Sequence, residues 1–376
     1  MKIKFSECVK YMVKGPFGSD MKKSLYVPKG EDTYKVYVQG NAIQKDENLG
    51  DYYIQSEYFH QKLKRFEVHP GDYIITCDGT LGKYIKLSEN IERGVISSSL
   101  LLLKLDEEVI YDKYFELLWD NSMLSYLASQ ARNACLVHLP SAKTIGEIII
   151  NLPELSVQRE MADKAFLIVN IIQQRNKELS MLDDLIKARF VEMFGDMYLN
   201  SKGWSEAKLE SMADVVSGIT KGRKTKSEDL TEVPYMAVSN VKDGYIDWTT
   251  VKTIEATQQE IEQYRLLADD VLMTEGGDPD KVGRGAIIKE PLENCIHQNH
   301  IFRVRLDESV MLPEFFAEYL QHQRSKRYFL GCAKQTTGIA SINMTQLRAL
   351  PVLMPSLSQQ EEFVLFKAQV DKSKVV

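Results

Sequence analysis

The fold of this chain is decided by a stretch that occurs twice, PGDYIITCDG at residues 70–79 and ADDVLMTEGG at residues 268–277. Both copies read as an acidic turn, a short apolar strand, a threonine, an acidic residue and glycine. A repeat at this separation predicts two equivalent structural units within one chain.

A second pair of segments keeps the same order and nearly the same spacing. NLPELSVQ at residues 151–158 corresponds to LMPSLSQQ at residues 353–360, an offset of 202 residues. Weaker echoes pair VQGN at 38–41 with VSN at 238–240, and SSSL at 97–100 with QNHI at 298–301. Because period and order hold across each half, we expect two similar domains.

Each half begins with strands and turns and continues into helices. Residues 34–39 and 233–238 are rich in β-formers, whereas residues 114–127 and 313–328 place apolar side chains at helical spacing. Glycines at 79–82 and 276–285 are expected in loops at strand ends. The predicted fold class is α+β, with two similar α/β domains separated by long antiparallel coiled-coil helices.

The segment between the halves predicts one long amphipathic helix. Residues 157–194 contain neither glycine nor proline, and Ser156 is a candidate cap. One heptad position is apolar throughout, which predicts a seam that packs on a partner helix. Its members are Ala165, Ile172, Leu179, Ile186 and Met193. The second helix begins with a capping-box spacing at Ser358 and Glu361, and its pattern is about half as long.

These patterns predict four regions along the chain. They are a first domain at residues 1–152, a central long helix at 153–197, a second domain at 198–354 and a short distal helix at 355–376.

Composition indicates a soluble multidomain protein of the cytoplasm. Of 376 residues, 44% are hydrophobic and 27% charged, and the amino terminus has no apolar signal segment. Five scattered cysteines fit reduced thiols better than a disulfide framework. The net charge of −6 permits a nucleic-acid partner through local basic clusters without suggesting one.

The sequence shows no catalytic motif. The glycine-rich segment at 218–222 lacks the spacing of a phosphate-binding loop, and no dinucleotide, methyl-donor or nucleophile-elbow pattern occurs. Cys295, His297 and His300 are three possible zinc ligands within six residues, but no second cluster completes a tetrahedral site. We therefore predict no bound metal, and interpret the acidic segment at 275–280 as a solvated turn.

Two segments of the second half resemble a known family. EGGDPDKVGRG at 275–285, followed by HQNHIFRVR at 297–305, is similar to one recognition-domain subtype of the specificity subunits of Type I restriction–modification systems. LSVQ at 155–158, LSQQ at 357–360 and ARFVEMFG at 188–195 resemble the boundaries of that family's conserved helices. The resemblance covers nearly the whole chain in the order domain, helix, domain, helix.

The resemblance implies a prokaryotic, cytoplasmic, non-catalytic subunit. Two target-recognition domains at opposite ends of a helical pair would each read half of a bipartite site in double-stranded DNA. The helices would set the spacer and dock two methyltransferase subunits, and restriction (motor) subunits would complete the complex. S-adenosylmethionine, ATP and Mg²⁺ would belong to those partners, with no cofactor in this chain.

Polar side chains on glycine-flanked loops are the candidate DNA contacts, because such loops let the backbone approach DNA closely. In the first half they are Lys14, Ser19, Lys22, Asn41, Thr80 and Lys83. In the second half they are Lys221, Arg223, Lys224, Lys281, Arg284, Asn299, Lys334, Thr336 and Thr337. Each has an alternative role as a solvated surface residue or as a polar group that satisfies a turn.

Two other classes of function remain open at this point. One is a coiled-coil scaffold with two ligand-binding domains and no role on DNA. The other is a nuclease or hydrolase whose catalytic residues are dispersed in the sequence.

Overall fold

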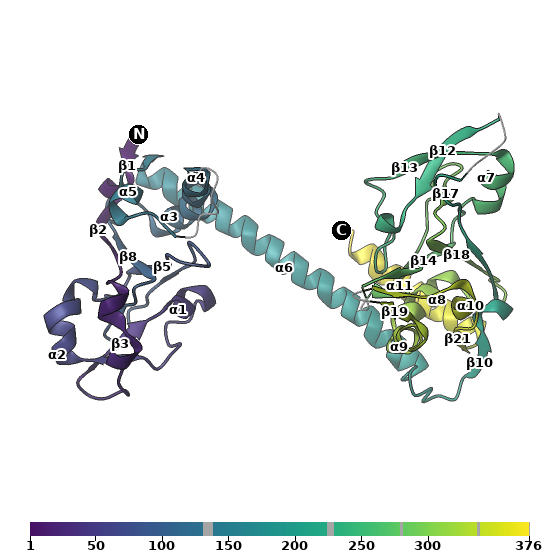
Figure 1. The fold of residues 1–376 in the computed structure, drawn as a ribbon, viewed down its shortest axis with the longest axis horizontal. Helices are drawn as coiled ribbons and strands as arrows, with labels where there is room; N and C mark the ends of the chain where they lie inside the picture. Colours follow the sequence, from purple (N-terminus) through teal and green to yellow (C-terminus); the bar gives the residue numbers. More distant parts are fainter. Residues whose placement is uncertain (131–137, 224–228, 279–280, 337–338, 376) are drawn as a thin grey trace. The chain divides into compact units, whose positions relative to one another are not determined.

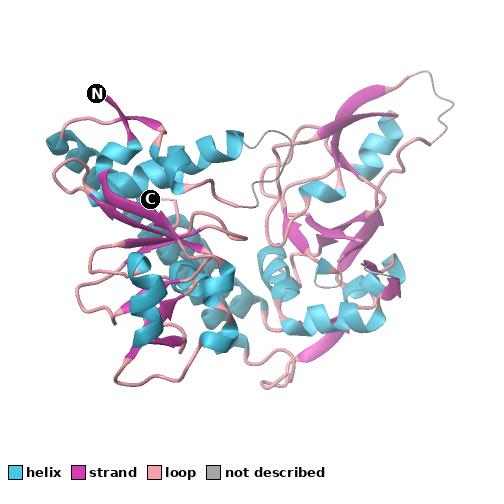
Figure 2. Cartoon of the chain, turned by 60° about the vertical axis from the view of Figure 1, so that its left-hand side comes forward, coloured by secondary structure: helices cyan, strands magenta, loops and turns pink. Residues whose placement is uncertain are grey.

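The computed structural model describes residues 1–130, 138–223, 229–278, 281–336 and 339–375. The chain divides into two compact units, Met1–Gln174 (unit 1) and Arg175–Val376 (unit 2). Helices and strands are mixed in both units (Figures 1 and 2). The predicted α+β class is therefore confirmed.

A four-stranded antiparallel sheet forms the centre of each unit. In unit 1 the strand order is β2-β8-β5-β6, formed by Val9–Lys14, Leu100–Leu105, Tyr73–Thr76 and Tyr84–Lys86. In unit 2 the order is β11-β18-β14-β16, formed by Ala213–Ser217, Ile301–Leu306, Val271–Thr274 and Gly285–Ile287. The repeated stretch thus provides the same inner strand, β5 or β14, in both units.

The smaller sheets are duplicated as well. Each unit contains a three-stranded sheet with one antiparallel and one parallel pairing. In unit 1 its order is β4-β3-β7 (Tyr53–Gln55, Thr33–Tyr37, Gly94–Ile96), and in unit 2 it is β13-β12-β17 (Lys252–Ala256, Thr231–Met236, Ile296–His297). The pair β1-β9 (Lys2–Lys4, Ile149–Asn151) matches β10-β21 (Ser205–Lys208, Pro351–Met354). Unit 2 also contains the sheet β15-β20-β19 (Gly276–Gly277, Ile339–Ser341, Lys334–Thr336).

The helices that follow each central sheet are more broken than the sequence predicts. Unit 1 contains α1 (Gln39–Gln44), α2 (Ser56–Tyr58), α3 (Asp112–Leu118), α4 (Leu124–Gln130) and α5 (Ala142–Gly146). Unit 2 contains α7 (Gln258–Tyr264), α8 (Pro313–Gln321), α9 (Gln323–Cys332) and α10 (Met344–Arg348). The single helix predicted at 313–328 was wrong, because His322 adopts extended backbone angles (φ −75°, ψ 153°) between α8 and α9. A π-helical turn at Trp119–Met123 separates α3 from α4.

Aromatic side chains fill the space between sheet and helices. In unit 1 the rings of Phe5, Phe115 and Trp119 are fully buried and pack in one cluster. In unit 2 Phe190 stacks on Phe315, with ring centroids 5.4 Å apart. Burial of a ring of this size stabilises a fold by about 1.5–3 kcal/mol, so these clusters anchor both units.

One buried glutamine in each unit ties the entry of a helix to the domain. Gln158 Oε1 accepts from the amide of Tyr111 at 2.8 Å, and Gln360 Oε1 accepts from the amide of Leu312 at 2.9 Å. Each Nε2 donates to two main-chain carbonyls at 2.9–3.1 Å. Both glutamines are at most 1% exposed. The Leu-x-x-Gln spacing therefore marks a duplicated structural clamp.

The predicted long helix is confirmed as α6, which runs without a break from Leu155 to Phe194. It ends at Gly195, whose φ of +76° suits a residue without a side chain. The distal helix α11, Leu357–Ser373, runs antiparallel to the second part of α6 within unit 2. Arg189 bonds to Glu362 at 2.7 Å, whereas Arg175 reaches the carbonyl of Lys374 at 3.2 Å.

Only part of the predicted heptad series packs within this chain. Ile186 is 4% exposed and joins the core of unit 2, whereas Ile172 is 54% exposed in unit 1. Ala165, Leu179 and Met193 are half-buried. Ile168 and Ile171 add to the exposed apolar surface of the first part of α6.

No helix in the described part of the chain is long and apolar enough to cross a membrane.

Candidate nucleic-acid interface

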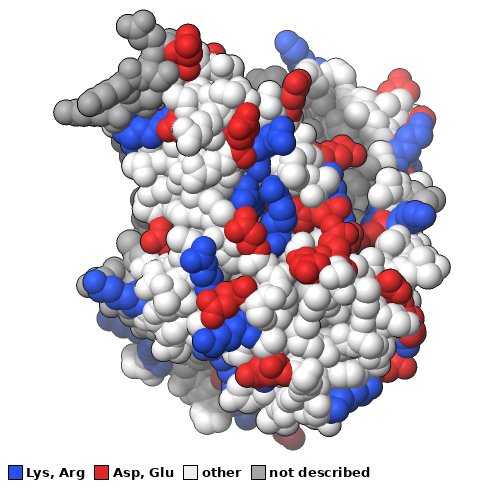
Figure 3. Space-filling model, turned by 90° about the vertical axis from the view of Figure 1, so that its right-hand side faces the viewer, with Lys and Arg blue, Asp and Glu red and all other residues white. Residues whose placement is uncertain are grey.

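The charge of the surface is mixed. On the face drawn in Figure 3, Lys and Arg side chains are interleaved with Asp and Glu side chains. This agrees with the net charge of −6 and with ion pairs of the kind that joins Arg324 to Glu206. A candidate interface must therefore be identified from local geometry and not from a uniformly basic face.

Four segments of unit 2 meet along one line at the ends of the central strands. The amide of Ile219 donates to His297 O at 2.8 Å, and the amide of Asn299 donates to Ile219 O at 3.0 Å. The amide of Glu275 donates to His300 O at 3.0 Å, and the amide of Ile342 donates to Glu275 O at 2.8 Å. We call residues 218–223, 275–278, 297–300 and 339–342 the unit 2 strip.

Unit 1 holds corresponding segments together, and two of its bonds match those of unit 2. The bonds of Cys77 and Leu139 are equivalent to those of Glu275 and Ile342, whereas the first segment is joined through Gly15. The amide of Gly15 donates to Leu100 O, that of Cys77 to Ser99 O, and that of Leu139 to Cys77 O, each at 2.8 Å. Residues 15–19, 77–80, 97–99 and 138–139 form the unit 1 strip. The weak echo between residues 97–100 and 298–301 is thus a structural equivalence.

A glycine at the same place in both strips lets two main-chain segments come into contact. A Cβ atom on Gly15 would collide with the carbonyl oxygen of Ser97, and one on Gly218 with that of His297. Sequence reasoning did not single out this pair, although the positions align when β2 is compared with β11. Both glycines are required for close approach and not for an unusual φ.

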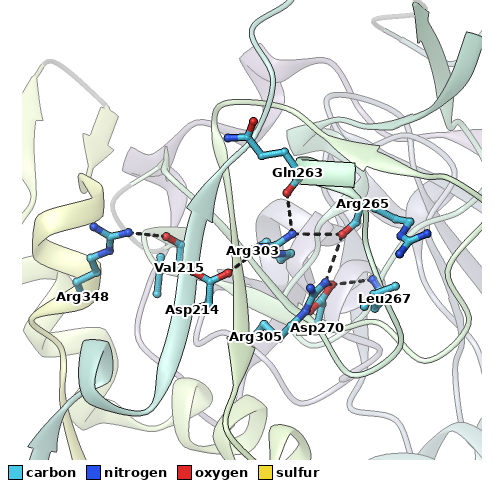
Figure 4. A network of polar contacts seen from close by, with 9 residues as sticks. All are labelled: Asp214, Val215, Gln263, Arg265, Leu267, Asp270, Arg303, Arg305 and Arg348. Atoms are coloured by element: carbon cyan, nitrogen blue, oxygen red, sulfur yellow. Dashed lines mark hydrogen bonds and ion pairs between the residues drawn. The ribbon is translucent and has the colours of Figure 1, made fainter. Parts of the chain in front are cut away.

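The strand that leads out of the unit 2 strip is fixed by two arginines, the buried Arg303 and the partly exposed Arg305 (Figure 4). Arg303, 4% exposed, donates to Asp214 at 2.8 Å and to the carbonyls of Gln263 and Arg265 at 3.1 and 3.3 Å. Arg305 forms a bidentate pair with the buried Asp270 at 2.7 and 2.8 Å. Since a buried charge is stable only when paired, these contacts hold β18 in place.

Each strip carries one imidazole–carboxylate pair. His138 Nδ1 lies 2.7 Å from Asp78 Oδ1 in unit 1, and His300 Nδ1 lies 2.5 Å from Glu275 Oε2 in unit 2. Both histidine side chains are more than half exposed, at 66% and 55%. The sequence alone did not indicate this pair, because His138 and Asp78 are 60 residues apart in the chain.

The predicted residues of unit 2 gather around its strip. Lys221 and Lys334 are exposed, Lys281 pairs with Asp278, and Arg284 is half-buried with a buried Nε that has no hydrogen-bond partner. Lys224 and Thr337 lie outside the described residues, and Thr336 belongs to β19.

Arg223 has a structural partner. Its Nε and Nη2 donate to Glu260 at 2.6 and 2.5 Å, and this bidentate contact lowers the pKa of Glu260 to about 2. The contact fastens the loop to α7, and we therefore remove Arg223 from the candidate DNA contacts.

In unit 1 the predicted residues are spread more widely. Ser19, Lys22, Thr80 and Lys83 are exposed. Lys14 donates to the carbonyl of Leu139 at 3.0 Å and so braces the strip from inside.

Asn41 was wrongly predicted as a DNA contact, because its side chain is fully buried. Its Oδ1 accepts from the amide of Val38 at 2.8 Å, and its Nδ2 donates to the carbonyls of Asp46 and Leu49 at 2.9 and 2.8 Å. Asn240 makes equivalent bonds in unit 2, to the amide of Ala237 and the carbonyl of Asp247, both at 2.9 Å. This duplicated asparagine orders a turn.

The three possible zinc ligands of unit 2 lie in separate surroundings. Cys295 is buried in an apolar cluster, and burial raises the pKa of its thiol to about 12. His297 is buried beneath the strip, where burial lowers its pKa to about 3, and its Nδ1 donates to Ile301 O at 3.0 Å. Among the described residues, no group of three His, Cys, Asp or Glu side chains is arranged to hold a metal ion.

Comparison with known proteins identifies the architecture. The profile described as "Type I restriction modification DNA specificity domain" matches residues 201–375. The second half of the chain is therefore similar to the DNA specificity domain of Type I restriction–modification systems. Its sequence is 26% identical over 170 residues to a putative type I restriction enzyme MjaX specificity subunit of Methanocaldococcus jannaschii, covering 45% of this chain and 39% of that protein.

Two further relatives extend the match along the chain. The EcoBI specificity subunit of Escherichia coli is 20% identical over 82% of this chain and 68% of its own length, and the MjaVIII specificity subunit of M. jannaschii is 24% identical over 77% and 74%. The alignments to the MjaX and EcoKI subunits span less than half of those proteins.

The fold agrees with solved structures of this family. The Type I restriction–modification S subunit from M. genitalium aligns over 100% of this chain and 90% of its own, with a TM-score of 0.56 and 13% identity. A second match comes from a structure that describes complex assembly and conformational transition of the type I R-M system. That chain aligns over 100% of this chain and 90% of its own, with a TM-score of 0.55 and 14% identity. At these identities the likeness concerns the fold alone.

Proposed function

We propose that this chain reads a bipartite site in double-stranded DNA, each unit recognising one half-site through its strip. The observation that carries the proposal is the duplicated strip. Both units join three corresponding segments through equivalent main-chain bonds, at Cys77 in unit 1 and at Glu275 in unit 2, yet the side chains they present differ. Two readers of different short sequences need this combination of a constant frame and variable contacts.

We further propose that the helices provide the spacer and the dock. The exposed isoleucines on the first part of α6 form an apolar surface of the kind that packs on partner helices. Two methyltransferase subunits would bind there, and restriction subunits would join the complex. Methyl transfer, cleavage and the use of S-adenosylmethionine, ATP and Mg²⁺ would belong to those partners, in the cytoplasm of a prokaryote.

The test uses the chain assembled with its cognate methyltransferase. Mapping of methylated bases in a host that expresses both proteins gives the two half-sites and their spacing. A labelled duplex with that site should bind more tightly than a scrambled one by at least a thousandfold, a typical margin for specific recognition. Adding about 5 base pairs, half a helical turn, to the spacer should abolish this margin, since one half-site then faces away from its unit.

Two matched variants assign the half-sites. Lys221→Ala should weaken binding through one half-site, and Lys83→Ala, an exposed lysine of unit 1, through the other. Binding that ignores sequence and spacer length would instead favour a scaffold without a role in DNA recognition. Cleavage of DNA by the purified chain with Mg²⁺ or Mn²⁺ would favour a nuclease.

A further inference from the structure

Three polar side chains of the unit 2 strip form a continuous chain of contacts. The carboxylate of Glu275 lies 2.5 Å from His300 Nδ1, and His300 Nε2 lies 3.4 Å from Asn299 Nδ2. Asn299 is half-buried at the end of this chain of contacts.

The chemistry of the three groups fixes the direction of every hydrogen bond. A carboxylate only accepts, so Nδ1 of His300 carries the proton that is donated to Glu275. An amide NH₂ only donates, so Nε2 of His300 must be the acceptor for Asn299. With Nδ1 donating to Glu275, the neutral imidazole presents Nε2 as an acceptor toward the amide nitrogen of Asn299.

The main chain at Asn299 is fixed without help from this side chain. Its amide donates to Ile219 O at 3.0 Å, and its carbonyl accepts from Ser217 Oγ at 2.7 Å. The next strand, β18, is anchored by the ion pairs of Arg303 with Asp214 and of Arg305 with Asp270 (Figure 4). A side chain presented from so firmly held a backbone loses little conformational freedom when it binds a partner.

The contact with His300 uses one N–H of Asn299, and within the described part of the chain no hydrogen bond to Oδ1 or from the second N–H is found. This acceptor–donor pair matches adenine in the major groove, where N6–H₂ donates and N7 accepts. Resting on the proposed function, we infer that Asn299 reads one adenine of the half-site bound by unit 2. Glu275 and His300 are positioning residues, because they set which amide atom faces the base.

Unit 1 lacks these residues at the corresponding places. Cys77 takes the place of Glu275, and Ser98 and Ser99 take those of Asn299 and His300, as the matching main-chain bonds show. The adenine contact therefore belongs to unit 2 alone, and Ser98 offers a matched control position.

The first experiment measures binding of the assembled complex to duplexes in which each adenine of the mapped site is replaced by 7-deazaadenine. This base differs from adenine only in that a C–H group replaces the N7 acceptor. For one adenine in one half-site, the replacement should weaken wild-type binding and leave Asn299→Ala unaffected. Asn299→Ala itself should bind the unmodified site roughly 5- to 150-fold less tightly, the usual range for one bidentate base contact. Ser98→Ala should leave the effect of every replacement in that half-site unchanged.

The second experiment tests the positioning residues by base preference. His300→Ala and Glu275→Ala should reduce the ratio of binding between the adenine duplex and duplexes with another base at that position. A purely structural role would weaken all duplexes by the same factor. The double variant with Asn299→Ala should discriminate no less than Asn299→Ala alone.

The outcomes separate the inference from the proposed function. If the wild-type complex does not distinguish its mapped site from a scrambled duplex, the proposed function fails. If it does, but no adenine shows a 7-deaza effect that depends on Asn299, the inference fails alone. Asn299→Asp preserves the shape and removes the donor, so it must lose the same N7 effect even if the alanine variant folds poorly.

Discussion

Replacing Gln360 with alanine should destabilise unit 2 while leaving unit 1 intact. Gln360 is fully buried and makes three hydrogen bonds to main-chain groups of Leu312, Val310 and Pro355. The truncation removes all three at once and leaves one amide and two carbonyls without these partners. At about 1–1.5 kcal/mol for each bond, the free energy of unfolding of unit 2 should fall by roughly 3–4.5 kcal/mol.

The duplicated clamp supplies an internal counterpart. Gln158 makes the same three kinds of bond in unit 1, so Gln158→Ala should destabilise that unit by a similar amount. Gln369→Ala is the matched control on α11, because Gln369 is exposed and its side chain has no hydrogen bond in the described structure. We expect the control to change stability by less than about 0.5 kcal/mol.

Hydrogen exchange measured by mass spectrometry in increasing urea separates the two units within one sample. In Gln360→Ala, amides of β14 and β18 should exchange at lower urea than in the wild type, whereas amides of β5 and β8 should not change. If both units lose protection together, or if Gln360→Ala behaves like Gln369→Ala, the clamp does not have the structural role assigned to it.

Three other perturbations have distinct expected results. Ile186→Asp should destabilise unit 2 by several kcal/mol in thermal melting because it buries an unpaired charge, whereas Ile172→Asp, at an exposed site, should leave melting unchanged and weaken methyltransferase binding. Gly218→Ala should lower the free energy of unfolding of unit 2 by about 1–3 kcal/mol, since the added Cβ atom collides with His297 O. The same variant should abolish recognition of one half-site. Recognition equal to that of the wild type would contradict the role of this glycine. Burial lowers the pKa of His297 to about 3, so as the pH falls the unfolded state takes up a proton on this side chain before the folded state does. The free energy of unfolding should therefore be highest above about pH 6.5 and lower by about 2 kcal/mol at pH 5. Urea unfolding of His297→Gln should show a smaller loss over the same pH range.

The sequence predicted the features that depend on pattern and repetition. Residues 70–79 and 268–277 contain equivalent strands because both carry a short, fully buried apolar run between an acidic turn and a glycine. The helix at 157–194 was predictable because no residue within it interrupts helical hydrogen bonding.

Long-range contacts explain what the sequence could not show. Asn41 follows a glycine, as a DNA contact on a loop would, but it lies in α1, and main-chain groups of the neighbouring turn occupy its side-chain amide. Arg223 belongs to a basic run, yet Glu260 lies opposite it once α7 is in place. The break at His322 interrupts a helical pattern whose apolar spacing continues on both sides, so periodicity alone could not locate it.

The two units differ in a way that bears on how specificity is encoded. Residues that hold the frame recur at equivalent places, as with Gln158 and Gln360, or Gly15 and Gly218. Residues that face outward from the strips do not recur: Ser98 stands where unit 2 has Asn299. A frame fixed by main-chain bonds tolerates such exchanges, because the strip keeps its shape whichever side chain it presents. Base preference in each half-site can then change through a few side chains, while stability depends on the buried clamps beneath them.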